Sequence, residues 1–241
     1  KMKAQVLLAV LLYVVVAVHS QQYWDSEFKA LTDLFSTTDG FDWKNSTNWL
    51  TNKVYCGWYG VTCNYNYHVT ALLLPNNGLN GILPTTLGNL TYLNRIDLSK
   101  NKLTGPIPDT LAIPTLNTMT LIGNSFTSIP DTFTKLQSLT QLFLSDNLIS
   151  GNFPSSLTQL KALTLLDLSN NKLQGDLPLS LSDLYVKYNL RNLYLAGNGF
   201  KSIPADLPMP APFLAACDLS GNSFRCSIPK WTERLCSASC R

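Results

Sequence analysis

The stretch Leu93-Asn-Arg-Ile-Asp-Leu-Ser-Lys-Asn-Lys-Leu-Thr-Gly-Pro-Ile-Pro108 decides the fold of this 241-residue chain. Its first, fourth and sixth residues are apolar, its ninth is asparagine, and a proline closes it. Related stretches recur at spacings of 23 to 27 residues. They begin at Val69, Leu93, Leu116, Leu139, Leu163, Leu190 and Leu214. Such regular recurrence indicates a chain built from stacked copies of one unit.

Two columns of residues run through all seven copies. The ninth position is always asparagine, at Asn77, Asn101, Asn124, Asn147, Asn171, Asn198 and Asn222. The closing proline recurs at Pro84, Pro108, Pro130, Pro154, Pro178, Pro204 and Pro229. Repeats of 20–29 residues with this pattern are leucine-rich repeats, in which each copy supplies one short strand. The sequence therefore predicts an α/β solenoid of seven leucine-rich repeats, with parallel strands on its concave face.

The asparagine column has a structural explanation. Alternate residues of each strand turn inward, so the leucines of successive coils form one core. Each coil then leaves its strand in a bend, where an amide side chain can satisfy backbone groups of two coils. We therefore expect an asparagine ladder without a catalytic role. We also expect convex helical turns to close the core through Leu87 with Leu90, Phe133 with Leu136, Leu157 with Leu160, and Leu181 with Leu184.

A stack of this kind exposes its core at both ends and needs two caps. Before the repeats, an amphipathic stretch at helical spacing precedes three tryptophans: Phe28, Leu31, Phe35, Trp43, Trp49 and Trp58. A carbohydrate platform is the alternative, but we interpret these residues as the plug of a cap. After the repeats, Trp231 and Leu235 are predicted to form the second plug. The predicted boundaries are 21–68 for the N-terminal cap, 69–229 for the repeats and 230–241 for the Cys-rich cap.

The first twenty residues have the pattern of a signal peptide. Two lysines precede the apolar run Val6 to Val18, and small residues precede a cut after Ser20. The run is too short for a membrane-spanning helix; a membrane anchor or a buried strand are the alternatives. Removing residues 1–20 lowers the formal charge from +3 to +1. We therefore expect a secreted chain without a mature transmembrane segment and without general attraction to nucleic acid.

Cysteines and sequons fit an extracellular chain. The six cysteines are Cys56, Cys63, Cys217, Cys226, Cys236 and Cys240. An even number after a signal peptide favours disulfides over zinc. The last four allow three pairings, among which the sequence does not choose. Asn45 and Asn89 begin glycosylation sequons.

The string Cys56-Gly-Trp-Tyr-Gly-Val-Thr-Cys63 resembles the N-terminal cap of plant-type extracellular leucine-rich-repeat proteins, which include receptor-kinase ectodomains and polygalacturonase-inhibiting proteins. The repeats agree, because Asn101 to Pro108 is similar to the N-x-L-x-G-x-I-P of that group. The resemblance extends from about Phe28 to Pro229. It implies a right-handed superhelix, a Cys56–Cys63 disulfide and a binding role.

Departures from this pattern are local. Repeats three and six lack the glycine before Ile-Pro, and the fifth carries three extra residues near 184–188, where we expect a loosened convex loop. The closing Cys-rich segment differs from the cap of the plant inhibitors. A receptor role would require a further signalling segment or a separate signalling partner.

Function is expected on the concave face, where repeat positions two, three, five, seven and eight point away from the core. The candidate ligand-binding residues are Arg95, Asp97, Thr120, Gln141, Phe143, Asp167, Arg191, Tyr194 and Asp218. Phe143 and Tyr194 are expected to be exposed among carboxylates, which is the chemistry of an interface anchor. Scattered aromatics without any partner are the alternative.

Catalysis is not predicted, and we expect no metal or cofactor. His68, the one histidine outside the signal peptide, is expected at the edge of the cap. Asp97, Asp167 and Asp218 are two or three repeats apart, whereas paired glycosidase carboxylates of the retaining kind lie about 5 Å apart.

Three binding functions remain from the sequence. The first is recognition of an extracellular protein or peptide, the second inhibition of a secreted wall-degrading hydrolase. The third is binding of ice or a glycan surface, suggested by Thr and Asn in the second strand position. Arg191 and Ala215 interrupt that array, so this function ranks last.

Overall fold

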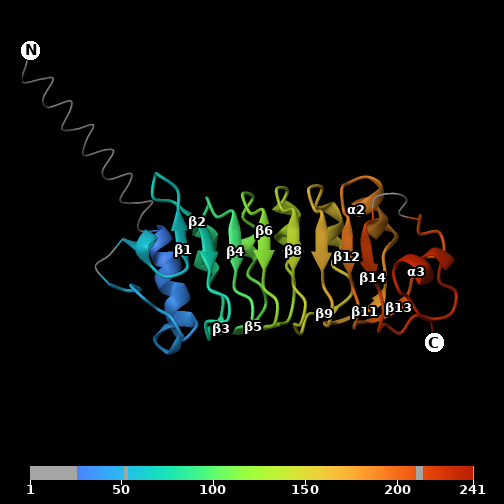
Figure 1. Ribbon diagram of the computed structural model, residues 1–241, viewed down its shortest axis with the longest axis horizontal. Helices are drawn as coiled ribbons and strands as arrows, with labels where there is room; N and C mark the ends of the chain where they lie inside the picture. Colours follow the sequence, from blue (N-terminus) through green and yellow to red (C-terminus); the bar gives the residue numbers. More distant parts are fainter. Residues whose placement is uncertain (1–25, 52–53, 210–213, 241) are drawn as a thin grey trace, which may run out of the picture.

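The computed structural model describes residues 26–51, 54–209 and 214–240. They form an elongated stack of coils with a cap at each end (Figure 1). Within these ranges no helix has the length and apolarity that crossing a bilayer would require. The predicted signal peptide at 1–20 lies outside the described residues.

The long sheet confirms the predicted solenoid. Its parallel strands are β2 (Val69–Leu73), β4 (Arg95–Asp97), β6 (Thr118–Thr120), β8 (Gln141–Phe143), β10 (Leu165–Asp167), β12 (Asn192–Tyr194) and β14 (Ala216–Asp218). Each residue pairs with the residue at the same repeat position in the next coil. An eighth strand, β1 (Val61–Cys63), pairs antiparallel with β2 and was not predicted from the sequence.

The inner face of this sheet is apolar and buried. Its middle column is Leu72, Ile96, Met119, Leu142, Leu166 and Leu193. These side chains belong to one continuous core that runs from Ala30 in the N-terminal cap to Ala238 in the C-terminal cap. The predicted convex pairs complete it, since Leu87, Phe133, Leu157, Leu181 and their partners are all buried.

The asparagine ladder forms as predicted. Asn147 Nδ2 donates to the carbonyls of Leu144 and Ser145 in its own bend, both at 3.1 Å, and to Leu121 O of the preceding coil at 3.0 Å. Its Oδ1 accepts from Phe126 N at 3.0 Å. Asn77 differs, because it exchanges two hydrogen bonds with the backbone of Asn45 and so joins the first coil to the cap.

Residues just before the ladder adopt left-handed backbone conformation. Their φ values lie between 50° and 67° at Asn76, Lys100, Gly123, Asp146, Asn170, Gly197 and Gly221. Glycine, asparagine and aspartate tolerate this conformation best, which explains their frequency at this position. Lys100 is the exception and adopts it with an ordinary side chain.

The return side of each coil contains short strands and helices. Two small sheets order as β3 (Asn80–Ile82), β5 (Lys102–Gly105), β7 (Ser125–Phe126) and as β13 (Gly199–Ser202), β11 (Lys172–Asp176), β9 (Ser150–Gly151). The 3₁₀ helices are η3 (Thr85–Asn89), η4 (Asp109–Leu111), η5 (Asp131–Lys135), η6 (Ser155–Gln159) and η7 (Leu179–Ser182). Each follows directly on a proline of the predicted column, which cannot donate a ladder hydrogen bond.

The extra residues of the fifth repeat do not form the loosened loop that was predicted. They form the short helix α2 (Asp183–Val186), which continues η7. Leu184 and Tyr185 are buried, and Tyr185 Oη donates to Pro208 O at 3.1 Å. Burial of two large side chains orders the insertion.

The N-terminal cap is packed around aromatic rings. A helix at residues 26–37 is followed by η1 (Gly40–Asp42) and η2 (Tyr55–Gly57). Trp43, Trp49 and Trp58 are buried, as the plug interpretation predicts, and the Trp49 ring lies within 5 Å of both other tryptophan rings by centroid distance. Cys56 is joined to Cys63, as the family resemblance implies.

The C-terminal cap differs in part from the prediction. Its helix α3 (Lys230–Leu235) leaves Leu235 53% exposed and Trp231 half-buried, so Leu235 is not part of a plug. The buried residues are Thr232, Cys236 and Ala238. Disulfides Cys217–Cys236 and Cys226–Cys240 settle the pairing that the sequence left open. Cys217 occupies the inner column of β14, so the first of these anchors α3 directly to the core.

Candidate ligand-binding face

The fifth strand position forms one row across the concave face. In spatial order the row is Leu73, Asp97, Thr120, Phe143, Asp167, Tyr194 and Asp218. All seven side chains are half-buried, as expected for residues that stand on a sheet surface. Asp167 lies directly between Phe143 and Tyr194, and Asp218 follows Tyr194. The structure therefore brings two large rings and two carboxylates of the predicted set together, and leaves Asp97 apart from them.

Each carboxylate of this row is oriented by a serine two residues later. Asp167 Oδ1 accepts from Ser169 N at 3.0 Å and from Ser169 Oγ at 2.6 Å. Asp97 makes the same two bonds with Ser99, at 3.0 and 2.7 Å. Asp218 Oδ1 accepts from Ser220 N at 2.9 Å. The recurring string Asp-Leu-Ser is the sequence signal for these serines, which were not predicted as part of the site.

Third-position side chains flank the row. Among the predicted residues, Arg95 and Gln141 lie here, with Arg95 on the same strand as Asp97. Asn192 also lies in this column and donates to Tyr194 Oη at 3.2 Å. Asn192 thus helps to fix the Tyr194 ring, a role the sequence did not indicate.

Charge is distributed unevenly along the concave face. Within the described ranges, no basic group lies within ion-pair distance of Asp97, Asp167 or Asp218. Toward the C-terminal end, Asp146 adds a third carboxylate, whose Oδ1 accepts from Asn170 Nδ2 at 2.8 Å. In the four repeats that contain β8, β10, β12 and β14, Arg191 is the one cation at positions two, three, five and eight. This half of the face is therefore acidic, whereas Arg95 and Lys100 outnumber Asp97 in the other half.

Side chains at the second repeat position form hydrogen bonds within the protein. Thr140 Oγ1 donates to Asn117 Oδ1 at 3.0 Å, and Thr164 Oγ1 donates to Thr140 O at 2.9 Å. Asn94 Nδ2 donates to Thr115 O at 3.3 Å. These polar groups join neighbouring coils, which reduces what they can offer to a ligand.

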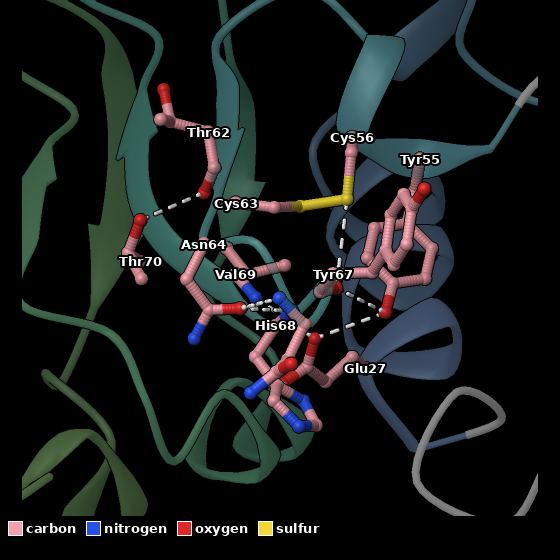
Figure 2. Close-up of a disulfide and its surroundings, with 11 residues drawn as sticks. Glu27, Tyr55, Cys56, Thr62, Cys63, Asn64, Tyr67, His68, Val69 and Thr70 are labelled. Atoms are coloured by element: carbon pink, nitrogen blue, oxygen red, sulfur yellow. Dashed lines mark hydrogen bonds and ion pairs between the residues drawn. A yellow bond between two sulfur atoms is a disulfide. The ribbon is translucent and has the colours of Figure 1, made fainter. Parts of the chain in front are cut away.

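His68 lies in the N-terminal cap, where the sequence placed it. Figure 2 shows it beside Glu27, Tyr55 and the Cys56–Cys63 disulfide. Its Nδ1 lies 3.4 Å from Glu27 Oε1, and its ring stacks on Tyr92 with centroids 4.2 Å apart. Glu27 Oε2 accepts from Val69 N at 3.0 Å and from Tyr55 Oη at 3.1 Å. Burial, together with the Glu27 carboxylate, raises the pKa of Tyr55 well above its ordinary value.

Two surface pockets lie away from the concave row. One of about 570 Å³ borders the N-terminal cap and is lined by polar residues that include Asp39, Lys44 and Lys102. The other, about 380 Å³, lies on α3 between Met209 and Trp231. Neither contains a residue of the predicted ligand-binding set.

The two predicted glycosylation asparagines lie at the surface near the N-terminal end. Asn45 is half-buried, and its Oδ1 accepts from Thr47 N of its own sequon at 3.0 Å. Asn89 is exposed at the end of η3. Their occupancy stays a prediction.

Comparison with known families identifies the repeats. Residues 92–112 and 114–173 match families described as leucine rich repeats. Among curated proteins, the receptor-like kinase TMK2 of Arabidopsis thaliana is 34% identical over 116 residues, which are 47% of this chain and 13% of the kinase. The chain thus spans a small fraction of the curated relatives it matches.

Solved structures of plant origin share the fold. The LRR ectodomain of the Arabidopsis thaliana receptor kinase GASSHO1/SCHENGEN3, in complex with Casparian strip integrity factor 2, matches with a TM-score of 0.75 and 29% identity. The match covers 88% of this chain and 25% of the ectodomain. A plant ice-binding protein matches with a TM-score of 0.62 and 22% identity, over 83% of this chain and 72% of that protein. The second likeness shows the shared fold alone.

Proposed function

Because the chain is a leucine-rich-repeat protein similar to the ectodomains of plant receptor-like kinases, we propose that it binds an extracellular protein or peptide on its concave face. The observation that carries this proposal is the row on β8 to β14, in which half-exposed Phe143 and Tyr194 alternate with Asp167 and Asp218. Aromatic rings in a polar surround provide most of the binding energy at many protein interfaces.

The dimensions of the sheet suit such a ligand. Seven parallel strands at about 4.8 Å spacing give a face roughly 29 Å long, enough for an extended peptide of eight or nine residues. One ectodomain of this fold is known in complex with another molecule, Casparian strip integrity factor 2. Extracellular location is supported by the predicted signal peptide and by three disulfides, which persist in oxidising compartments.

A non-catalytic role is part of the proposal. The described residues contain no group of three or more His, Cys, Asp or Glu side chains placed to hold a metal ion. His68 contacts Glu27 of the cap and stacks on Tyr92 of the first repeat, so it helps to connect the cap to the repeats. The hydrolase-inhibitor hypothesis uses the same concave face and differs only in the class of partner.

A binding screen tests the proposed function. Mature protein, residues 21–241, is presented with extracellular domains, secreted hydrolases, wall glycans and ice, and the Phe143→Ala/Tyr194→Ala double variant serves as the control. We expect a protein or peptide ligand whose affinity falls at least tenfold in the double variant. A ligand that binds both forms equally would place recognition on another surface, and binding only to glycan or ice would refute the proposal.

A further inference from the structure

The centre of the concave row has an aromatic–carboxylate–aromatic arrangement. Phe143, Asp167 and Tyr194 occupy the same position of three consecutive strands, paired in register. At about 4.8 Å per strand, the two rings are rooted roughly 10 Å apart with the carboxylate midway. A group bound over Asp167 would therefore have one ring on each side.

A cation is the group whose chemistry fits this arrangement. Guanidinium and ammonium ions are attracted to an aromatic face within about 6 Å of its centre, and a carboxylate between two rings adds a charge-assisted hydrogen bond. An anionic group would be repelled by Asp167. A purely apolar group would remove the carboxylate from water without offering a partner, which is unfavourable.

We propose that an arginine or lysine side chain of a peptide ligand binds at Asp167, between Phe143 and Tyr194. This inference rests on the proposed function, since it specifies the chemistry of a ligand on the concave face. Within the described ranges, Asp167 Oδ2 accepts no hydrogen bond, while Oδ1 is held by Ser169. The carboxylate is thus oriented by one oxygen and can bind a ligand through the other.

The surrounding charge favours the same ligand. Asp146 and Asp218 are nearby members of the acidic half of the face, and no basic side chain of the described residues neutralises Asp167. Clustered carboxylates around one cation site increase the attraction for a basic peptide and its rate of association.

The chain contains a matched control for this site. Asp97 has the same position in its strand and the same two bonds to the serine that follows, at 3.0 and 2.7 Å. Its row neighbours are Leu73 and Thr120, and Arg95 shares its strand. Asp97 therefore has the same backbone setting as Asp167 without the rings or the acidic surround.

Selection from a random decapeptide display library tests the inference. Mature protein is used to enrich peptides, whose composition is compared with that of the unselected library. The affinities of enriched peptides are then measured for wild type, Asp167→Asn, Asp97→Asn and Phe143→Ala/Tyr194→Ala. Asparagine keeps the Oδ1 acceptor for Ser169 or Ser99, and thermal melting of each variant verifies that it is folded.

We expect enrichment of arginine and lysine, at least tenfold weaker binding to Asp167→Asn, and a clearly smaller loss of affinity in Asp97→Asn, which lies in the row but outside its β8 to β14 part. Peptides that lose affinity in the aromatic double variant but are not basic, or that bind Asp167→Asn normally, would overturn the cation site and leave the proposed function standing. Equal weakening of binding in both aspartate variants would also overturn the cation site. If no enriched peptide depends on the two rings, the proposed function itself fails.

Discussion

At the N-terminal end the first coil is covered by the helix at 26–37 and by Trp43, Trp49 and Trp58, with one disulfide spanning seven residues. At the C-terminal end the last coil is covered by the six residues of α3 and by two disulfides, spanning 19 and 14 residues. Figure 1 shows the two caps at opposite ends of the stack. One end is closed by aromatic packing, the other chiefly by covalent links.

The difference follows from how much apolar side chain each segment brings. Burial of an aromatic ring contributes several kcal/mol at about 25 cal/mol per Å² of apolar surface. The N-terminal cap buries three tryptophans, whereas α3 leaves Leu235 exposed and Trp231 half-buried. A small cap with little to bury needs cross-links to remain attached to the core.

The sharpest test of this comparison places the same substitution in both caps. Trp58→Ala should lower the free energy of unfolding by about 3–5 kcal/mol, because its buried ring contacts Phe28, Trp49 and Tyr55. Trp231→Ala should cost about 1–2 kcal/mol, because the ring is half-buried and its one hydrogen bond, to Leu207 O at 3.1 Å, is lost. Denaturant unfolding of both variants measures the difference, and equal losses would contradict a packing difference between the caps.

Removal of a disulfide should disturb the C-terminal cap more than the N-terminal cap. Cys217→Ala/Cys236→Ala should cost about 3 kcal/mol, and Cys56→Ala/Cys63→Ala about 2.5 kcal/mol, from loop closure alone. The two variants should differ more clearly in the local order of the affected cap, because aromatic packing still holds the N-terminal cap in place. Limited trypsin digestion should cut at Arg234 in the first variant and leave Lys29 protected in the second. Early cleavage at Lys29 would mean that the N-terminal cap also depends on its cross-link.

The repeat pattern predicted most of the fold because its columns report periodic, local requirements. Asn147 and its equivalents had to satisfy two coils, and Leu166 had to face the core. The non-repeating parts escaped the same reasoning. Strand β1, the burial of Tyr185 in α2 and the exposure of Leu235 depend on contacts made once, for which no second copy gives a pattern.

The candidate site was predicted as residues but not as an arrangement. Strand register places Asp167 between Phe143 and Tyr194, and seven aligned positions sufficed to place them in one row. The role of Ser169 in orienting the carboxylate and of Asn192 in holding the tyrosine hydroxyl required side-chain geometry. Short polar side chains have several local partners, so spacing alone does not choose among them.

Glu27 offers a smaller test, within the N-terminal cap. Glu27→Gln should lower stability by about 1–2 kcal/mol at pH 7, because the buried carboxylate accepts from Val69 N and Tyr55 Oη. Loss of the Glu27 carboxylate should also move the pKa of Tyr55 back toward its ordinary value. Burial would then be the remaining cause of the raised pKa.

The alkaline limb of stability reports that change. A raised tyrosine pKa means that the folded state keeps its proton while the unfolded chain ionises near pH 10, so stability falls as pH rises above that value. The fall should level off at a lower pH in Glu27→Gln, because the folded-state pKa of Tyr55 is then raised by burial alone. Tyr185, whose pKa is also raised by burial, contributes equally to the fall in both forms. A fall that levels off at the same pH in both forms would show that Glu27 does not act on Tyr55.

Asp33 gives the smallest expected effect. Burial raises its pKa, but hydrogen bonds from Lys29 and Thr86 and the charge of Lys29 outweigh this, so the pKa is lowered. A lowered carboxyl pKa contributes stability above the unfolded value, near 4, which is lost as pH falls through the folded pKa. Asp33→Asn should therefore cost less than about 0.5 kcal/mol at pH 7, since solvent screens the pair, and this cost should vanish as pH falls through the lowered folded-state pKa.

Asp33 pairs with Lys29 at the surface and also connects the N-terminal cap to the first repeat. Its Oδ2 accepts from Thr86 Oγ1 at 2.8 Å, which joins the cap helix to η3 of the first repeat. Asp183 pairs with Lys187 at 2.9 Å inside the α2 segment and links no second element. Asp183→Asn is therefore the matched control, because it loses an i,i+4 ion pair but no bond between elements, and its unfolding midpoint at pH 7 should change less than that of Asp33→Asn. If Asp33→Asn behaves identically, the N-terminal cap is held by its aromatic core and the Glu27 contacts without help from its surface.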